Sequence, residues 1–121
     1  MSAAPPKSFK ELLARYEEGE RIFAGAELEE GADLSGACLD GIDLSKAFVV
    51  AWFKGASLRG AVFRDANVKT CDFSGADLTE ADFSRAALCS TTFQGARLEG
   101  ARFGGAYFHS RILIEPERPD W

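Results

Sequence analysis

AWFKGASLRGAVFRDANVKT (51–70), CDFSGADLTEADFSRAALCS (71–90) and TTFQGARLEGARFGGAYFHS (91–110) are the three rows of twenty residues that decide the fold. Within each row a five-residue unit recurs, in which a small residue is followed two positions later by a large apolar one. Twelve consecutive units keep this form. Their large residues are Phe53, Leu58, Phe63, Val68, Phe73, Leu78, Phe83, Leu88, Phe93, Leu98, Phe103 and Phe108.

A period of five residues excludes ordinary secondary structure. An α-helix repeats every 3.6 residues and a flat strand every two, so neither keeps these side chains on one face. Glycine recurs two positions after the large residue, as at Gly55, Gly75 and Gly95. Because glycine tolerates sharp backbone corners, the pattern predicts a coil that turns every five residues. The large and small apolar residues point inward, and the other three residues of each unit point outward.

The pattern continues upstream with two irregularities. One residue is inserted between Leu28 and Leu34, and one is deleted between Val49 and Phe53. Six upstream units bring the total to eighteen. Their large residues are Phe23, Leu28, Leu34, Leu39, Leu44 and Val49.

These units resemble the A(D/N)LxG motif of the pentapeptide-repeat family over about residues 21–110. The matching units include Ala32-Asp33-Leu34-Ser35-Gly36, Ala76-Asp77-Leu78 and Ala81-Asp82-Phe83. The resemblance implies an all-β solenoid, a right-handed quadrilateral β-helix of about 4.5 coils with 20 residues in each coil. Residue n then stacks on residue n+20, so the large residues form buried ladders.

Three segments are expected: a leader with a capping helix (1–20), the repeat (21–110) and a tail (111–121). The leader is similar to the helical leader of many bacterial members of the family. Ser8-Phe9-Lys10-Glu11 fits a capping box, and Gly19 suits a helix stop, so a helix at about 9–18 is expected to cover the first coil. The tail either folds over the last coil or pairs with a second copy about a two-fold axis. A monomer and a homodimer through the C-terminal end therefore both remain open.

Composition limits the class of protein. The chain has 121 residues and a net charge of -5, and its longest apolar run, Ala47–Phe53, is seven residues. Such a run is too short for a membrane helix, the N-terminus lacks a signal-peptide core, and the acidic balance argues against direct nucleic-acid binding. We expect a cytoplasmic protein with no membrane partner. Cys38, Cys71 and Cys89 are an odd number without CxxC spacing, which favours free thiols over a disulfide framework.

The outward charges alternate in sign along the predicted rod. The net charges are -2 for residues 31–50, +3 for 51–70, -3 for 71–90 and +1 for 91–110. Opposite charges one coil apart are expected to pair, with Asp77 between Ser57 and Arg97 and Asp82 next to Arg102. We interpret these as solvated pairs that fix the register of the coils.

No catalytic or metal-binding constellation appears. His109 is the only histidine, has no evident partner, and is interpreted as a surface or capping residue. The aspartates recur because the repeat places them, and no metal-ligand spacing is present. We expect no cofactor, no metal and no enzymatic activity.

One apolar patch departs from the rule. Around the deletion, Phe48, Val50 and Trp52 occupy outward positions, and Tyr107 and His109 fall on the same side. Ala87 and Cys89 lie between them. An exposed apolar stripe of this kind is a candidate interaction surface. In the alternative, the irregular coil turns Phe48 or Trp52 inward, or the leader packs over them.

The sequence therefore favours a non-catalytic protein-interaction or scaffold module with an unidentified protein partner. The alternative is a DNA-mimicking regulator of DNA gyrase, because some members of the family resemble B-DNA and either protect gyrase from quinolones or inhibit it. A mimic needs a long, continuously acidic rod, and the basic band at 51–70 interrupts the acid.

Overall fold

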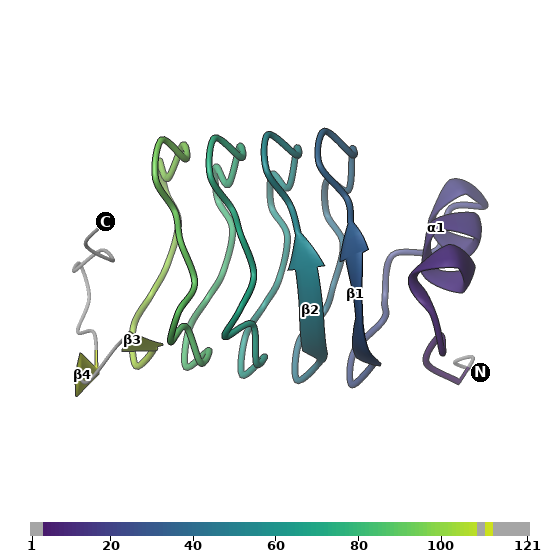
Figure 1. Ribbon diagram of the computed structural model, residues 1–121, viewed down its shortest axis with the longest axis horizontal. Helices are drawn as coiled ribbons and strands as arrows, with labels where there is room; N and C mark the ends of the chain where they lie inside the picture. Colours follow the sequence, from purple (N-terminus) through teal and green to yellow (C-terminus); the bar gives the residue numbers. More distant parts are fainter. Residues whose placement is uncertain (1–3, 109–110, 113–121) are drawn as a thin grey trace.

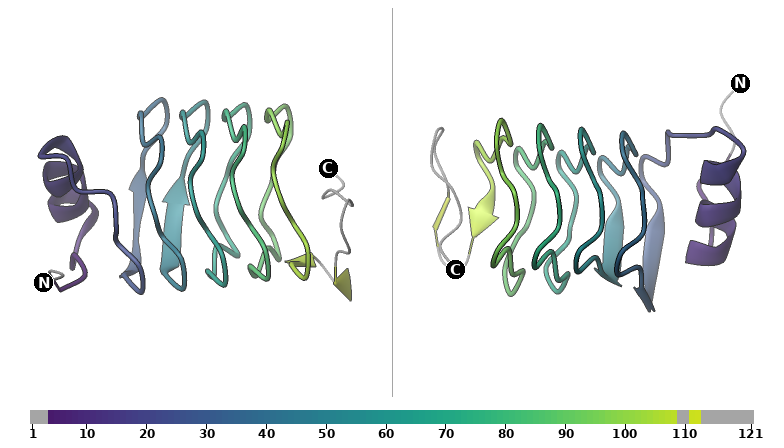
Figure 2. Two further views of the ribbon diagram at one scale, coloured as in Figure 1. Left: turned by 180° about the vertical axis from the view of Figure 1, so that it is seen from behind. Right: turned by 90° about the horizontal axis from the view of Figure 1, so that it is seen from above.

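The protein is a β-solenoid. The computed structural model describes residues 4–108 and 111–112. Coils of similar shape stand side by side in a row, with helix α1 (Phe9–Glu17) at the N-terminal end (Figure 1). The views from behind and from above show the same row of coils, with helix α1 at one end (Figure 2).

Bridges between neighbouring coils define the architecture. All twelve isolated bridges among the described residues are parallel. From Trp52 onward the bridged residues are 20 positions apart, as in the bridges of Asp72 to Trp52 and to Thr92. The bridges and the strand pairs arrange outward residues in four columns: Ile22-Asp43-Val62-Asp82-Arg102, Glu27-Phe48-Asn67-Ala87-Tyr107, Asp33-Trp52-Asp72-Thr92 and Cys38-Ser57-Asp77-Arg97. The expected 20-residue stacking is present, whereas the handedness and the total number of coils stay predictions.

Stacked side chains fill the interior of the coils. Of the twelve repeat centres from Phe53 to Phe108, eleven are buried and Leu98 is half-buried. The rings of Phe53 and Phe73 stack with centroids 5.1 Å apart and planes 3° apart. The rings of Phe63 and Phe73, which belong to neighbouring ladders, meet edge to face at 5.6 Å and 77°. Both are favourable arrangements of aromatic rings, so the ladders stabilise the rod beyond their buried area.

The corners need left-handed backbone. At one corner the Ala56 N–H donates to the Phe53 carbonyl at 2.9 Å, and Gly55 within this turn has φ +69°. Non-glycine residues take the same conformation at five described corners, where a Cβ makes it costly. They are Lys46, Asp65, Glu80, Arg85 and Ser90, with φ between 59° and 64°.

The two irregular units form the longest strands. Strands β1 (Glu27–Asp33) and β2 (Phe48–Trp52) pair in parallel. Leu28 pairs with Val49 and Ala32 with Ala51, so β1 carries two extra residues as a bulge opposite β2. The insertion in β1 and the deletion in β2 add up to this offset of two residues, which changes the separation of paired residues from 21 to 19. From Trp52 onward the separation is 20 residues.

The leader forms the expected helix, α1, which ends at Glu17. The Ser8 hydroxyl accepts the Glu11 N–H at 3.1 Å, as in a capping box. The Glu11 carboxylate, however, accepts the N–H of Lys7 at 3.2 Å and not that of Ser8. Gly19 follows the helix with φ +103°.

Helix α1 packs against the N-terminal end of the coils and is hydrogen-bonded to it. Its residues Phe9 and Leu12 are buried, and the Phe9 N–H donates to Glu30 Oε1 at 2.9 Å. The Tyr16 hydroxyl donates to the Asp40 carbonyl at 2.7 Å, and the Arg15 guanidinium lies 5.5 Å from the Phe23 ring centroid. The helix thus covers the open end of the stack, where unpaired coil backbone would otherwise invite association.

At the C-terminal end, β3 (Tyr107–Phe108) pairs antiparallel with β4 (Arg111–Ile112), and Tyr107 faces Ile112. The expectations for the tail beyond Ile112 lie outside the described residues.

Candidate interaction surface

Three apolar residues of β2 form one exposed corner, which we call the apolar corner: Phe48, Val50 and Trp52. Side chains alternate along a strand, so Val49 and Ala51 are buried while the apolar corner points outward. Phe48 is 38% exposed and Trp52 is 48% exposed, and Val50 is half-buried. The alternative in which the irregular coil turns Phe48 or Trp52 inward is therefore wrong.

The deletion explains this exposure. Lys69–Thr70 and Cys89–Ser90 form turns at the corresponding corner of the next two coils, but β2 runs through this corner as a continuous strand. On the other side, Gly31 lies in the β1 bulge with φ +75°, and a Cβ there would lie 3.7 Å from the Trp52 ring. The Trp52 ring thus rests over the bulge with about half of its surface exposed.

The expected stripe is divided by the coil geometry. Phe48 and Tyr107 share one column, but Asn67 and Ala87 separate them. Trp52 belongs to the neighbouring column, on the other side of the corner. Tyr107 is 45% exposed and stands beside Ile112 at the far end of the rod. The structure therefore brings Phe48, Val50 and Trp52 together and leaves Tyr107 apart, and His109 lies outside the described residues.

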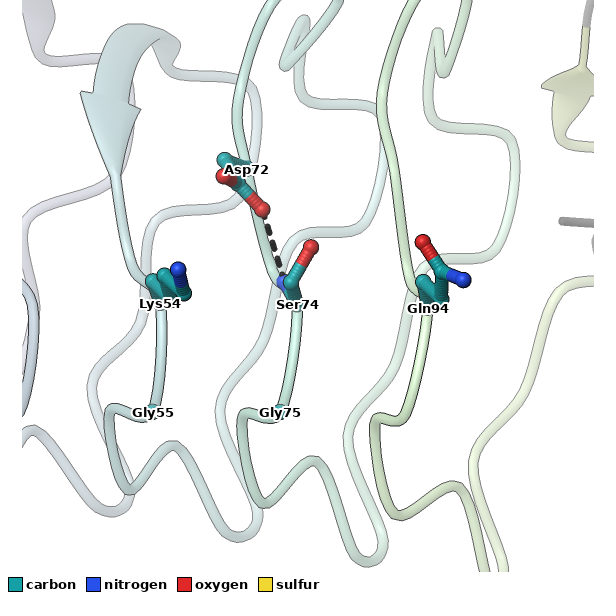
Figure 3. Close-up of a pocket in the computed structure, with 6 residues that line it drawn as sticks. All are labelled: Lys54, Gly55, Asp72, Ser74, Gly75 and Gln94. Carbon is teal, nitrogen blue, oxygen red and sulfur yellow. Dashed lines mark hydrogen bonds between the residues drawn. The ribbon is translucent and has the colours of Figure 1, made fainter.

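An open groove of about 490 Å³ lies across three coils, on the face of the rod that follows the Trp52 column in sequence (Figure 3). Its lining comes from equivalent positions of three coils: Lys54, Gly55, Asp72, Ser74, Gly75 and Gln94. Figure 3 shows the polar side chains in a row across the coils, with the Ser74 N–H donating to Asp72 Oδ1 at 2.8 Å. The repeat pattern does not predict this groove, because the groove is built from ordinary outward positions of the repeat.

The described side chains offer little for catalysis. The Cys71 thiol is buried and donates to the Val49 carbonyl, and burial raises its pKa to about 12, so it stays protonated at neutral pH. Cys38 is exposed, and Cys89 is half-buried. Within residues 4–108 and 111–112, no group of three His, Cys, Asp or Glu side chains is placed to hold a metal ion.

The charges between coils pair differently from the expectation. Arg102 does bridge Asp82 through the backbone, but the Asp82 carboxylate binds the Arg64 guanidinium, with its Nη2 at 2.6 Å. Asp82 is also not solvated, since it is only 8% exposed. Burial raises the pKa of Asp82, but the hydrogen bonds from Ser84 and Arg64 outweigh burial, so the pKa lies below its ordinary value.

Two further ion pairs have a different origin. Asp65 and Arg85 are both left-handed corner residues, and their side chains form a two-pronged contact at 2.9 and 3.0 Å. The Arg59 guanidinium lies 3.8 Å from the Asp77 carboxylate, which also accepts the Thr79 N–H at 3.1 Å. The repeat pattern describes corner residues only as outward. Asp65 and Arg85 are 20 positions apart and therefore stack one coil apart, and this spacing is the signal that would have predicted their ion pair.

Comparison with known proteins now decides the family. A family model described as pentapeptide repeats matches residues 51–79 and 71–109, with eight copies of the repeat. A solved pentapeptide-repeat protein from Nostoc Pcc 7120 is 32% identical, over 82% of this chain and 78% of that one, with a TM-score of 0.63. The chain belongs to the pentapeptide-repeat family. Pentapeptide-repeat proteins are in general structural or interaction folds.

Two further solved structures are similar to the chain. HetL, a protein involved in heterocyst differentiation regulation in the cyanobacterium Nostoc sp. strain PCC 7120, is 31% identical with a TM-score of 0.64. The match covers 80% of this chain but only 43% of HetL. QnrB1, a plasmid-mediated fluoroquinolone resistance protein, is 18% identical over 73% of this chain and 65% of its own, with a TM-score of only 0.35. None of the curated proteins matches the chain.

Helix α1 is too short and too polar to cross a membrane, and no other helix lies in the part of the chain that the structure describes.

Proposed function

We propose that this pentapeptide-repeat protein is a non-catalytic interaction module that binds a protein through the apolar corner. The observation that carries the proposal is the outward exposure of Phe48 and Trp52 on an otherwise regular rod. Exposed aromatic side chains supply contact area that a protein partner can desolvate, and Trp is enriched among the residues that dominate binding energy. The stacked core beneath the corner keeps these side chains in place before a partner arrives, which reduces the entropic cost of binding.

Photocrosslinking in cells tests this function. A benzoylphenylalanine placed at position 52 should give a defined protein adduct, identified by mass spectrometry. Glu99 is the matched control position, because it is exposed at the diagonally opposite corner of a regular coil. The proposal expects an adduct from position 52 that is absent from position 99 and that is lost when Phe48→Ser is added. Equal adducts from both positions, or none from position 52, would contradict it.

The alternative, a DNA-mimicking regulator of gyrase, gains no supporting observation. Lys54 and Lys69 are exposed on the rod beside the apolar corner and break a continuous acidic surface. A supercoiling assay with purified protein, with and without a quinolone and over a salt series, decides this alternative. Salt-sensitive inhibition or protection at micromolar protein would establish it, and no effect across the series would remove it.

A further inference from the structure

Three rows of residues with distinct chemistry lie side by side, in successive coils, along the edge of the rod that carries the apolar corner. The first is the acidic row, Glu27, Glu29 and Glu30 of β1, and it is followed by the apolar corner of β2. The next coil contributes Asn67 and Lys69 at the same corner, because Asn67 bridges Phe48 and Asp72 bridges Trp52. Along the rod axis the order is therefore acidic, apolar and basic.

The outer charges of this arrangement have no ion-pair partner among the described residues. Neither Glu27 nor Glu29 nor Lys69 takes part in any ion pair within that part of the chain, and all three are exposed. Glu30 differs from them, since its carboxylate accepts the Phe9 N–H and fastens helix α1. Asp72, the acid nearest Lys69 in the Trp52 column, is held by the Ser74 N–H. Glu27 and Glu29 on one side of the apolar corner, and Lys69 on the other side, thus remain available to a partner.

We propose that the occupant of the apolar corner is a second copy of this chain, packed antiparallel about a two-fold axis through Phe48, Val50 and Trp52. This inference rests on the proposed function and names its partner. A two-fold rotation perpendicular to the rod reverses the order of the rows, so acidic meets basic at both ends while apolar meets apolar in the centre. Glu29 of each copy then faces Lys69 of the other, and the interface is isologous.

A parallel arrangement of two copies is unfavourable, because it brings like charges together. A two-fold axis along the rod also brings the two apolar corners together but keeps the order of the rows, so it sets Glu29 against Glu29 and Lys69 against Lys69. Like charges brought together across an interface are strongly unfavourable. The antiparallel arrangement also leaves Tyr107 and Ile112 outside the contact, because they lie at the far end of the rod. It therefore differs from the homodimer through the C-terminal end that the sequence left open.

The size of the patch sets the expected strength. Stable interfaces bury about 800 Å² on each partner, and three apolar side chains with a charged rim supply less than that. We expect a reversible dimer with a dissociation constant in the micromolar range, which weakens as salt screens the rim charges.

Sedimentation velocity of the full chain over a concentration series tests the proposal. The wild-type chain should pass from monomer to dimer as its concentration rises. Glu29→Lys alone and Lys69→Glu alone should each weaken the dimer by about tenfold or more, because each places two like-charge contacts across the two-fold axis. Glu99→Lys, at the opposite corner, should change nothing. Circular dichroism of each variant verifies that the fold is kept.

Mixing the two single variants gives the sharper result. In a heterodimer of the Glu29→Lys and Lys69→Glu chains, both contacts again join opposite charges, so dimerisation should return to the wild-type level. A chain that stays monomeric at every concentration would overturn the proposal, and so would a dimer that ignores both charge variants. Either result leaves the photocrosslinking test of the proposed function standing, since an adduct at position 52 with a different protein supports that function and contradicts self-association.

Discussion

The regular coils and the irregular coil place their aromatic side chains on opposite sides of the backbone. From Phe53 to Phe103 the phenylalanines are fully buried and stack ring on ring at 4.8–5.3 Å. In β2, which ends directly before Phe53, Phe48 and Trp52 point to solvent. The chemistry of the side chains is the same in both regions. Register decides between core and surface, because one deleted residue turns a corner into a strand with a period of two.

The largest difference between the two regions should appear in stability. Phe73→Ala should lower the free energy of unfolding by about 3–5 kcal/mol, because it opens a cavity in the middle of an aromatic ladder, between Phe53 and Phe93. Urea denaturation followed by circular dichroism measures the change. Phe48→Ala is the matched control in the irregular coil and should cost far less. An unfolding midpoint unchanged by Phe73→Ala would show that the ladder assignment is wrong.

A smaller effect is expected where a charge is buried between regular coils. Asp82→Asn should cost about 1–2 kcal/mol at pH 7, because it weakens the hydrogen bonds from Arg64 and Ser84. The folded-state pKa of Asp82 is lowered, so its stabilisation is present above the unfolded pKa of about 3.9 and is lost as pH falls through the folded value. Denaturation curves from pH 7 to pH 3 should therefore converge for the two proteins. A difference that persists undiminished at the acid end would contradict the assigned role.

The corners can be compared by a reciprocal pair of substitutions. Gly60→Ala should destabilise by about 1 kcal/mol, because Gly60 has φ +68° and a Cβ resists that conformation even though the space around it is open. Ser90→Gly should stabilise by about 0.5 kcal/mol, since Ser90 holds the same conformation with a Cβ. Thermal unfolding measures both shifts. Shifts of the same sign would show that backbone strain does not govern these corners.

The apolar corner itself should tolerate the loss of an aromatic side chain far better than the core does. Trp52→Ala in the monomer should lower the free energy of unfolding by about 1–2 kcal/mol, clearly less than Phe73→Ala, because only half of the side chain is buried on folding. Chemical denaturation at low protein concentration measures it. A loss as large as that of Phe73→Ala would mean that Trp52 belongs to the core.

Regularity made most of this fold predictable. The period of five identified the inward residues, and the insertion and the deletion in the repeat located the disturbed corner. Leu98 is less buried than its position in the repeat predicts. The predicted stripe does not reach Tyr107 as one apolar patch, because the polar Asn67 follows Phe48 in the same column and Ala87 lies between Asn67 and Tyr107.

Side-chain pairing was harder to predict than register. Backbone bridges place Arg102 beside Asp82, yet the long Arg64 side chain reaches this carboxylate from the preceding coil. Reach and rotamer choice of arginine cannot be read from a repeat period. The cytoplasmic location and the protein partner stay predictions for a similar reason, since neither depends on the stacking that the sequence encodes.

Hydroxyl-radical footprinting of the isolated chain, at a concentration where it is monomeric, tests most directly whether the broken repeat turns its aromatic residues outward. Mass spectrometry would compare oxidation of Phe48 and Trp52 with that of Phe53 and Phe73. The structure predicts rapid oxidation of the first pair and strong protection of the second. Equal protection of all four would contradict the claim that the deletion in the repeat creates a binding surface.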